Sequence, residues 1–289
     1  MTTATAGTAA NSAAPDRSGL PSPGVGTAFR SELLKLRSVR SVGVMLVVAV
    51  AFIAAISLLY AHEQSFQGAS YVSSGQNGSP NQSVFAVQVN PTGTLLTGNI
   101  LGAALFAAFG AIAGALEYSS GMIRISLIAM PRRTRFLLCK GAAVATTAVA
   151  AAAGCTLACF LIGRSFFGSE VRATVGLTSP GVPLHLAGAV LCLAGWAMIG
   201  FAFAMLLRST ALGVTVSLAL YIAGPLLAEG IDPDGANNVT PTQAGQALWI
   251  YHNPLNPDIA PFGLGLAVFL GYVLVFLAAA FARVRYTDA

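Results

Sequence analysis

The side chains best suited to chemistry lie in one stretch, Glu117 to Lys140, which separates two long apolar runs. The stretch opens on a carboxylate and holds five of the chain's fifteen basic residues, Arg124, Arg132, Arg133, Arg135 and Lys140. Such groups form charge-assisted hydrogen bonds and dock onto polar or acidic surfaces. Because Lys and Arg concentrate in the cytoplasmic connectors of membrane proteins, we expect this stretch on the cytoplasmic side.

Within the stretch, apolar side chains recur at helical spacing. Met122, Ile125, Ile128 and Ala129 share one helical face, and Pro131 ends the helix because proline has no N–H for a further turn. The pattern predicts a short amphipathic helix between two membrane spans. Its apolar face needs either lipid headgroups or a soluble partner to rest on, and we favour the partner.

Composition places the chain in a membrane. Of 289 residues, 55% are hydrophobic and only 9% are charged, and the mean hydropathy is +0.74, so polar side chains are too few to cover a soluble globule. The net charge of +5 reflects basic residues between apolar runs, which favours membrane topology over nucleic-acid binding. All four cysteines, Cys139, Cys155, Cys159 and Cys192, lie in or beside apolar runs and are interpreted as small hydrophobic residues, although Cys155 and Cys159 are one helical turn apart.

Catalytic motifs are absent from the sequence. No phosphate loop, serine elbow or His-Glu-x-x-His pair occurs, so we expect this chain neither to hydrolyse ATP nor to act as another enzyme. The apolar runs are nearly free of ionisable residues, which argues against an intramembrane enzyme and against an ion-coupled carrier. We expect no cofactor and no metal on this chain.

The chain divides into a tail and one domain. Residues 1–26 are rich in Ala, Thr, Ser, Gly and Pro, and are predicted to be a disordered cytoplasmic tail. Residues 27–289 are predicted to form a single membrane domain. Its first segment, 27–41, is interpreted as an amphipathic helix in the membrane interface, or else as a charged flank of the first span. The residues of the interfacial helix are Phe29, Leu33 and Leu36, with Arg30, Lys35 and Arg37 around them.

Six apolar runs are long enough to cross a hydrocarbon core of about 30 Å as helices. They are residues 42–60, 95–116, 141–163, 184–207, 210–228 and 262–282. With the amino end inside, only Arg164 and Arg172 of the fifteen Lys and Arg residues fall in outer connectors. This asymmetry predicts an all-α, six-span bundle in the plasma membrane with both termini in the cytoplasm.

Two further patterns bear on packing. Span two carries Gly98, Gly102, Gly110 and Gly114, which would let another helix approach closely. Contact with a span of the same chain is favoured over a dimer seam. The outer connector 61–94 is predicted to be a solvated loop. Outer residues 243–251 are either a short helix dipping into the outer leaflet, with Trp249 and Tyr251 at the headgroup level, or an ordinary loop anchored by these two rings.

Taken together, the chain resembles the membrane permease subunit of type-2 ATP-binding-cassette (ABC) transporters of the Gram-positive bacterial exporter type. The resemblance lies in Phe29-Arg-Ser-Glu-Leu-Leu-Lys-Leu-Arg-Ser before span one and in Glu117-Tyr-Ser-Ser-Gly121, followed by Leu127, Pro131-Arg132-Arg133 and Lys140. These motifs cover about forty residues, and the topology extends the similarity over most of the chain.

The resemblance implies a coupling helix at about residues 119–130 that docks on a separately encoded ATPase, with Glu117 at its entrance. The residues implied in coupling are Glu117, Gly121, Met122, Arg124, Ile125, Leu127, Arg132, Arg133 and Lys140. It also implies that ATP and Mg²⁺ bind the partner ATPase, that a second permease copy or paralogue completes the assembly, and that the substrate is exported. An apolar or amphiphilic substrate is expected. A non-transporting scaffold or sensor that recruits a cytoplasmic partner is the alternative.

Overall fold

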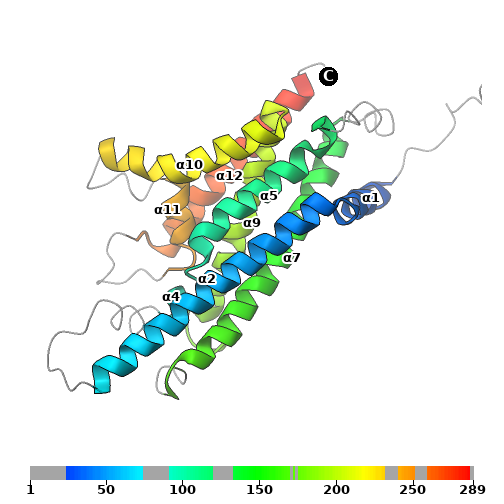
Figure 1. Cartoon of the computed structure of the whole chain (residues 1–289). Coiled ribbons are helices and arrows are strands. Elements are labelled where there is room, and N and C mark those ends of the chain that lie inside the picture. Colours follow the sequence, from blue (N-terminus) through cyan, green and yellow to red (C-terminus); the bar gives the residue numbers. More distant parts are fainter. Residues whose placement is uncertain are drawn as a thin grey trace, which may run out of the picture.

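The protein is a bundle of helices (Figure 1). A computed structural model describes residues 24–73, 91–119, 133–169, 172, 175–231, 240–250 and 259–286, and every regular element within these ranges is helical. The elements are α1 (Val25–Ser38), α2 (Arg40–Ser73), α4 (Pro91–Leu95), α5 (Asn99–Ser119), α7 (Arg133–Gly163), the short 3-10 helix η2 (Arg164–Phe166), α9 (Val182–Leu207), α10 (Thr210–Ile231), α11 (Pro241–Gln246) and α12 (Phe262–Tyr286). The predicted tail, up to residue 23, lies outside the described residues.

Six of these helices, α2, α5, α7, α9, α10 and α12, are long and apolar enough to span a membrane. They overlap the six predicted runs, although the second span begins at Asn99 and not at residue 95, so the prediction of an all-helical, multi-pass membrane bundle is confirmed. The predicted loop after Tyr60 is wrong at its start, because α2 continues to Ser73. Residues 61–67 contain no Gly or Pro to stop the helix, and Ala61 and Gln64 remain buried, so α2 stays packed beyond the apolar run.

Helices α5 and α9 form the centre of the bundle. In the most apolar 18 residues of each of these two helices, 67% of the residues are buried inside the chain, against 17–33% in the other four spans. The outer helices instead expose large apolar side chains such as Val47 on α2, Ile222 on α10 and Leu274 on α12. A surface of this kind is stable in contact with lipid tails, which are as apolar as leucine.

Glycine allows the two central helices to touch backbone to backbone. A methyl group at Gly110 of α5 would overlap the carbonyl oxygen of Ala197 on α9, and one at Gly200 of α9 would overlap the carbonyl oxygen of Ala107 on α5. Of the other span-two glycines, Gly98 and Gly102 face α2, and Gly114 faces α9. The predicted contact with spans of the same chain is therefore confirmed for all four.

The residues around Trp249 pack differently from the predicted membrane anchor. Helix α11 begins at Pro241, after Thr240 accepts a hydrogen bond from the Gln243 backbone N–H at 3.3 Å. Trp249 is only 2% exposed, so its ring lies inside the protein. Gly188 of α9 makes room for this segment, because a side chain there would overlap the Leu248 carbonyl. Of the two alternatives for residues 243–251, a Trp249 ring exposed among lipid headgroups is contradicted by this burial, and Tyr251 lies outside the described residues.

The glycine contact predicts a contrast between two alanine substitutions. Gly200→Ala should destabilise the protein by about 1–3 kcal/mol, because the facing backbone carbonyl cannot rotate away as a side chain would. Gly154→Ala on α7, where nothing lies within 4 Å of the added methyl group, should be neutral or slightly stabilising because alanine favours helix. Thermal unfolding of the purified variants in detergent measures both, and equal stabilities for the two would contradict the backbone contact.

Candidate functional site

Helix α1 lies at the end of the bundle from which the connector 120–132 leaves, here called the connector end (Figure 1). It packs mainly against α7, with α2 as its second neighbour. Leu36 is buried and Phe29 and Leu33 are half-buried, so much of the predicted apolar face is covered by the chain itself. Arg30 and Arg37 are exposed. A helix before the first span is thus present, and its contact with a membrane interface stays a prediction.

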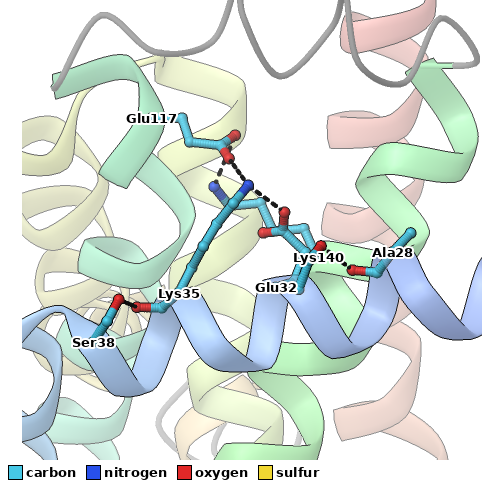
Figure 2. Close-up of polar contacts among 7 residues, drawn as sticks. Ala28, Glu32, Lys35, Ser38, Glu117 and Lys140 are labelled. Carbon is cyan, nitrogen blue, oxygen red and sulfur yellow. Dashed lines mark hydrogen bonds and ion pairs between the residues drawn. The ribbon is translucent and has the colours of Figure 1, made fainter. Parts of the chain in front are cut away.

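Four charged side chains from three helices meet where α1 faces α5 and α7. We call them the charge cluster: Glu32 and Lys35 of α1, Glu117 of α5 and Lys140 of α7. The ammonium Nζ of Lys35 lies 2.6 Å from Glu32 Oε1 and 3.0 Å from Glu117 Oε1. The other Glu117 oxygen, Oε2, lies 3.3 Å from Lys140 Nζ. Figure 2 shows Lys35 reaching from α1 towards Glu117, with Lys140 beside them.

Burial makes this cluster energetically important. Glu32 and Glu117 are each 3% exposed and Lys140 is 4% exposed, while the Lys35 side chain remains 37% exposed. Two carboxylates and two ammonium groups sum to zero charge. A buried charge without a partner is strongly unfavourable, whereas a balanced and hydrogen-bonded set is tolerated. Each member therefore depends on the others for its place inside the protein.

Lys35 stays protonated under all physiological conditions. Its partial burial acts to lower its pKa, but the hydrogen bonds and the attraction of Glu32 and Glu117 outweigh burial, so the pKa is raised above the usual 10.5. A raised pKa means that the folded protein holds this proton more tightly than the unfolded chain does. The contribution of Lys35 to stability is thus complete at neutral pH, and is lost only as the pH rises through that raised value.

The charge cluster links the two helix ends that flank the connector, the end of α5 and the beginning of α7, which we call the roots of the connector. Glu117 stands at the end of α5, just before the connector, and Lys140 stands two turns into α7, just after it. Most predicted coupling residues lie outside the described residues: Gly121, Met122, Arg124, Ile125, Leu127 and Arg132. Arg133 begins α7, but its side chain is not described. The coupling helix itself stays a prediction.

The sequence identified half of the cluster. Glu117 and Lys140 both belong to the residues that the family resemblance implies in coupling, and their side chains form an ion pair. Lys35 was interpreted as a charge flanking the apolar face of α1, yet its ammonium group lies within the cluster. Glu32 was missed altogether. Its signal was its place as the one acid in the basic segment 27–41, three residues before Lys35 and hence on the same helical face.

The cysteines and other possible metal ligands do not form a comparable site. Across the described ranges no three His, Cys, Asp or Glu side chains gather as a metal site would require. Cys155 and Cys159 lie 4.0 Å apart, sulfur to sulfur, and both are buried in the core of the bundle. The charge cluster is therefore the candidate functional site.

Comparison with known proteins gives no match, neither with a protein-family model nor with a curated protein sequence. The chain itself combines a bundle of six long apolar helices with a buried ion-pair network next to a basic connector.

The cluster predicts a rescue between two of its members. Glu117→Gln should destabilise the protein by about 3 kcal/mol or more, because it leaves buried Lys140 without a carboxylate. Adding Lys140→Met should recover much of that loss, since the unpaired charge is then gone. The exposed Glu229→Gln on α10 is the matched control and should have little effect. Thermal unfolding in detergent checks all three, and a double variant less stable than Glu117→Gln alone would contradict the pairing.

Proposed function

We propose that this chain is the permease subunit of a type-2 ABC transporter, which exports an apolar or amphiphilic substrate using ATP hydrolysed on a separate subunit. The observation that carries the proposal is the charge cluster, because it joins both roots of the basic connector to α1. Six apolar helices and the resemblance of residues 29–38 and 117–140 to this family support it further.

The proposed first step is docking. The connector 120–132 forms a coupling helix whose apolar face, with Met122 and Ile125, rests in a groove of the partner ATPase. Its arginines meet acidic groups around that groove. ATP and Mg²⁺ bind on the partner, and closure of two such ATPases moves two connectors, one from each permease of a dimer.

The proposed second step is transmission through the cluster. Pulling Glu117 away from Lys140 would leave the buried ammonium group of Lys140 without a carboxylate, which costs several kcal/mol. Moving the connector end of α5 and α7 together keeps the pair intact and is the cheaper response. Because Lys35 of α1 holds the same carboxylate, α1 is carried along with them. A movement of the coupling helix thereby becomes a joint movement of α1, α5 and α7.

The proposed third step is a change of access in the membrane. The centre of the bundle is built from α5 and α9, while the other spans present apolar faces outward. Tilting of the connector end of α5 changes which faces the two permeases present to each other, and a substrate with an apolar body can leave the inner leaflet and move outward. Apolar walls with few ionisable groups suit such a substrate.

Docking is tested by co-purification. Ile125→Asp should abolish co-purification with the candidate ATPase, because it places a charge on the apolar docking face. Leu177→Asp is the matched control: it makes the same kind of change at an exposed position beyond the far end of α7, and it should leave binding intact. Both variants have to reach the membrane in normal amounts. Equal recovery of the ATPase with both would contradict docking through the connector.

Transmission is tested with a variant that keeps the fold. The double variant Glu117→Gln/Lys140→Met should bind the ATPase normally but lose about tenfold or more in export and in the stimulation of ATP hydrolysis, in the range of coupling free energies between sites. Glu229→Gln is the control. Normal binding with unchanged export would contradict the role of the cluster. Binding of a partner that is no ATPase, with no export by the wild type, would instead favour the scaffold or sensor.

A further inference from the structure

Two arginines at the connector end have no carboxylate partner among the described residues. Arg208 occupies the tight connection between α9 and α10, and Arg283 lies in the last turn of α12. The carboxylates described at this end, Glu32 and Glu117, are engaged by lysines in the charge cluster. Within the described part of this end, the two arginines thus lie on segments distant in sequence and are not paired with either carboxylate.

Helix packing brings these two arginines near Tyr118. A methyl group on Gly114 of α5 would lie 3.2 Å from the side chain of Ala204 on α9. One helical turn further towards the connector end, α5 reaches Tyr118, while α9 ends at Leu207 with Arg208 directly after it. On α12, the ring of Phe276 contacts that of Phe203 on α9, with centroids 4.7 Å apart. Arg283 lies two turns beyond Phe276 on the same face of α12.

The charges and the burial of these side chains also indicate that Arg208, Arg283 and Tyr118 lie close together. Arg208 and Arg283 lie near enough to the Tyr118 hydroxyl for their charges to reach it, and the Glu117 carboxylate acts on it in the opposite sense. The Nε atom of Arg208 is buried and has no hydrogen-bond acceptor within the described chain. A guanidinium group has five N–H donors and no acceptor of its own, so an oxygen-rich anion is the group that would satisfy it.

The surroundings indicate where that anion comes from. Arg283 is exposed, while Arg208 and Tyr118 are half-buried, so the site is open at its edge. Leu207 and Leu212 flank the connection on either side, and both expose large parts of their side chains, 38% and 52%. The site therefore combines cationic donors at the ends of membrane-spanning helices with apolar side chains directly beside them. A headgroup phosphate with attached acyl chains matches this combination, whereas free phosphate uses only the charged part.

We propose that Tyr118, Arg208 and Arg283 bind the headgroup phosphate of an anionic membrane phospholipid, which joins the ends of α5, α9 and α12. The two guanidinium groups donate to the phosphate oxygens, and the phenol adds a third donor. The acyl chains then lie along the exposed leucines of α9 and α10. This site is separate from the charge cluster, and its existence does not depend on the proposed transport function.

Lipid titration tests the site. Short-chain phosphatidylglycerol is added to the full-length protein in a neutral detergent, and the thermal unfolding midpoint is followed. The midpoint should rise with lipid for the wild type. Each basic residue near an anionic surface contributes about fivefold to affinity, so Arg208→Gln/Arg283→Gln should bind roughly thirty-fold more weakly. Tyr118→Phe, which removes one hydroxyl and keeps the ring, should show a smaller loss.

Controls separate this site from general surface charge. Arg30→Gln/Arg37→Gln removes an equal charge from the exposed face of α1, outside this site, and should weaken the response to phosphatidylglycerol far less than Arg208→Gln/Arg283→Gln does. Phosphatidylcholine and inorganic phosphate should each give little stabilisation. The proposal is overturned if the Arg208/Arg283 variant keeps the wild-type affinity, if the α1 variant loses as much, or if inorganic phosphate alone reproduces the effect. If the double variant fails to fold, an unchanged affinity of Tyr118→Phe and of Arg283→Gln alone would likewise overturn it.

Discussion

The requirement that buried charge be neutralised governs the connector end of this protein. Glu117 lies almost completely inside the bundle, and a carboxylate there is acceptable only with cations at hydrogen-bonding distance. Lys140 meets this requirement from α7 and Lys35 meets it from α1, and Lys35 in turn allows Glu32 to be buried. The position of α1, which the apolar contacts alone would fix only loosely, therefore follows from the ionic partners of a residue on α5.

Hydropathy and charge asymmetry were sufficient to predict the six helices, because each depends on a long stretch of sequence and tolerates local errors. The pairing of Glu117 with Lys140 was also accessible, since both residues flank one connector. Glu32 and Lys35 were not, because their contacts depend on how α1 is rotated against α7, which is set by packing. Trp249 was misplaced for a similar reason: an aromatic residue near a span end fits a membrane interface and a protein interior equally well by sequence.

Different kinds of residue occupy the centre, the periphery and the helix ends of the bundle. Small residues allow α5 and α9 to lie close together, and large apolar residues on the outer helices face the membrane. Ionisable groups are concentrated where helices end, at the charge cluster and around Tyr118. A protein built in this way can respond to events at its connector end without placing a charge at mid-depth, which agrees with a substrate recognised by its apolar surface in the proposed export function.

The close backbone contacts of Gly110 with Ala197 and of Gly200 with Ala107 also limit how this bundle can deform. Two helices whose backbones touch have no layer of side chains that could change rotamers and let one slide past the other. Helices α5 and α9 therefore resist sliding past each other at these points. A rearrangement that keeps both these contacts and the charge cluster would tilt the two helices together about their crossing point, with the connector ends of α1 and α7 following, so that a small displacement at one end of the pair reappears, reversed in direction, at the other.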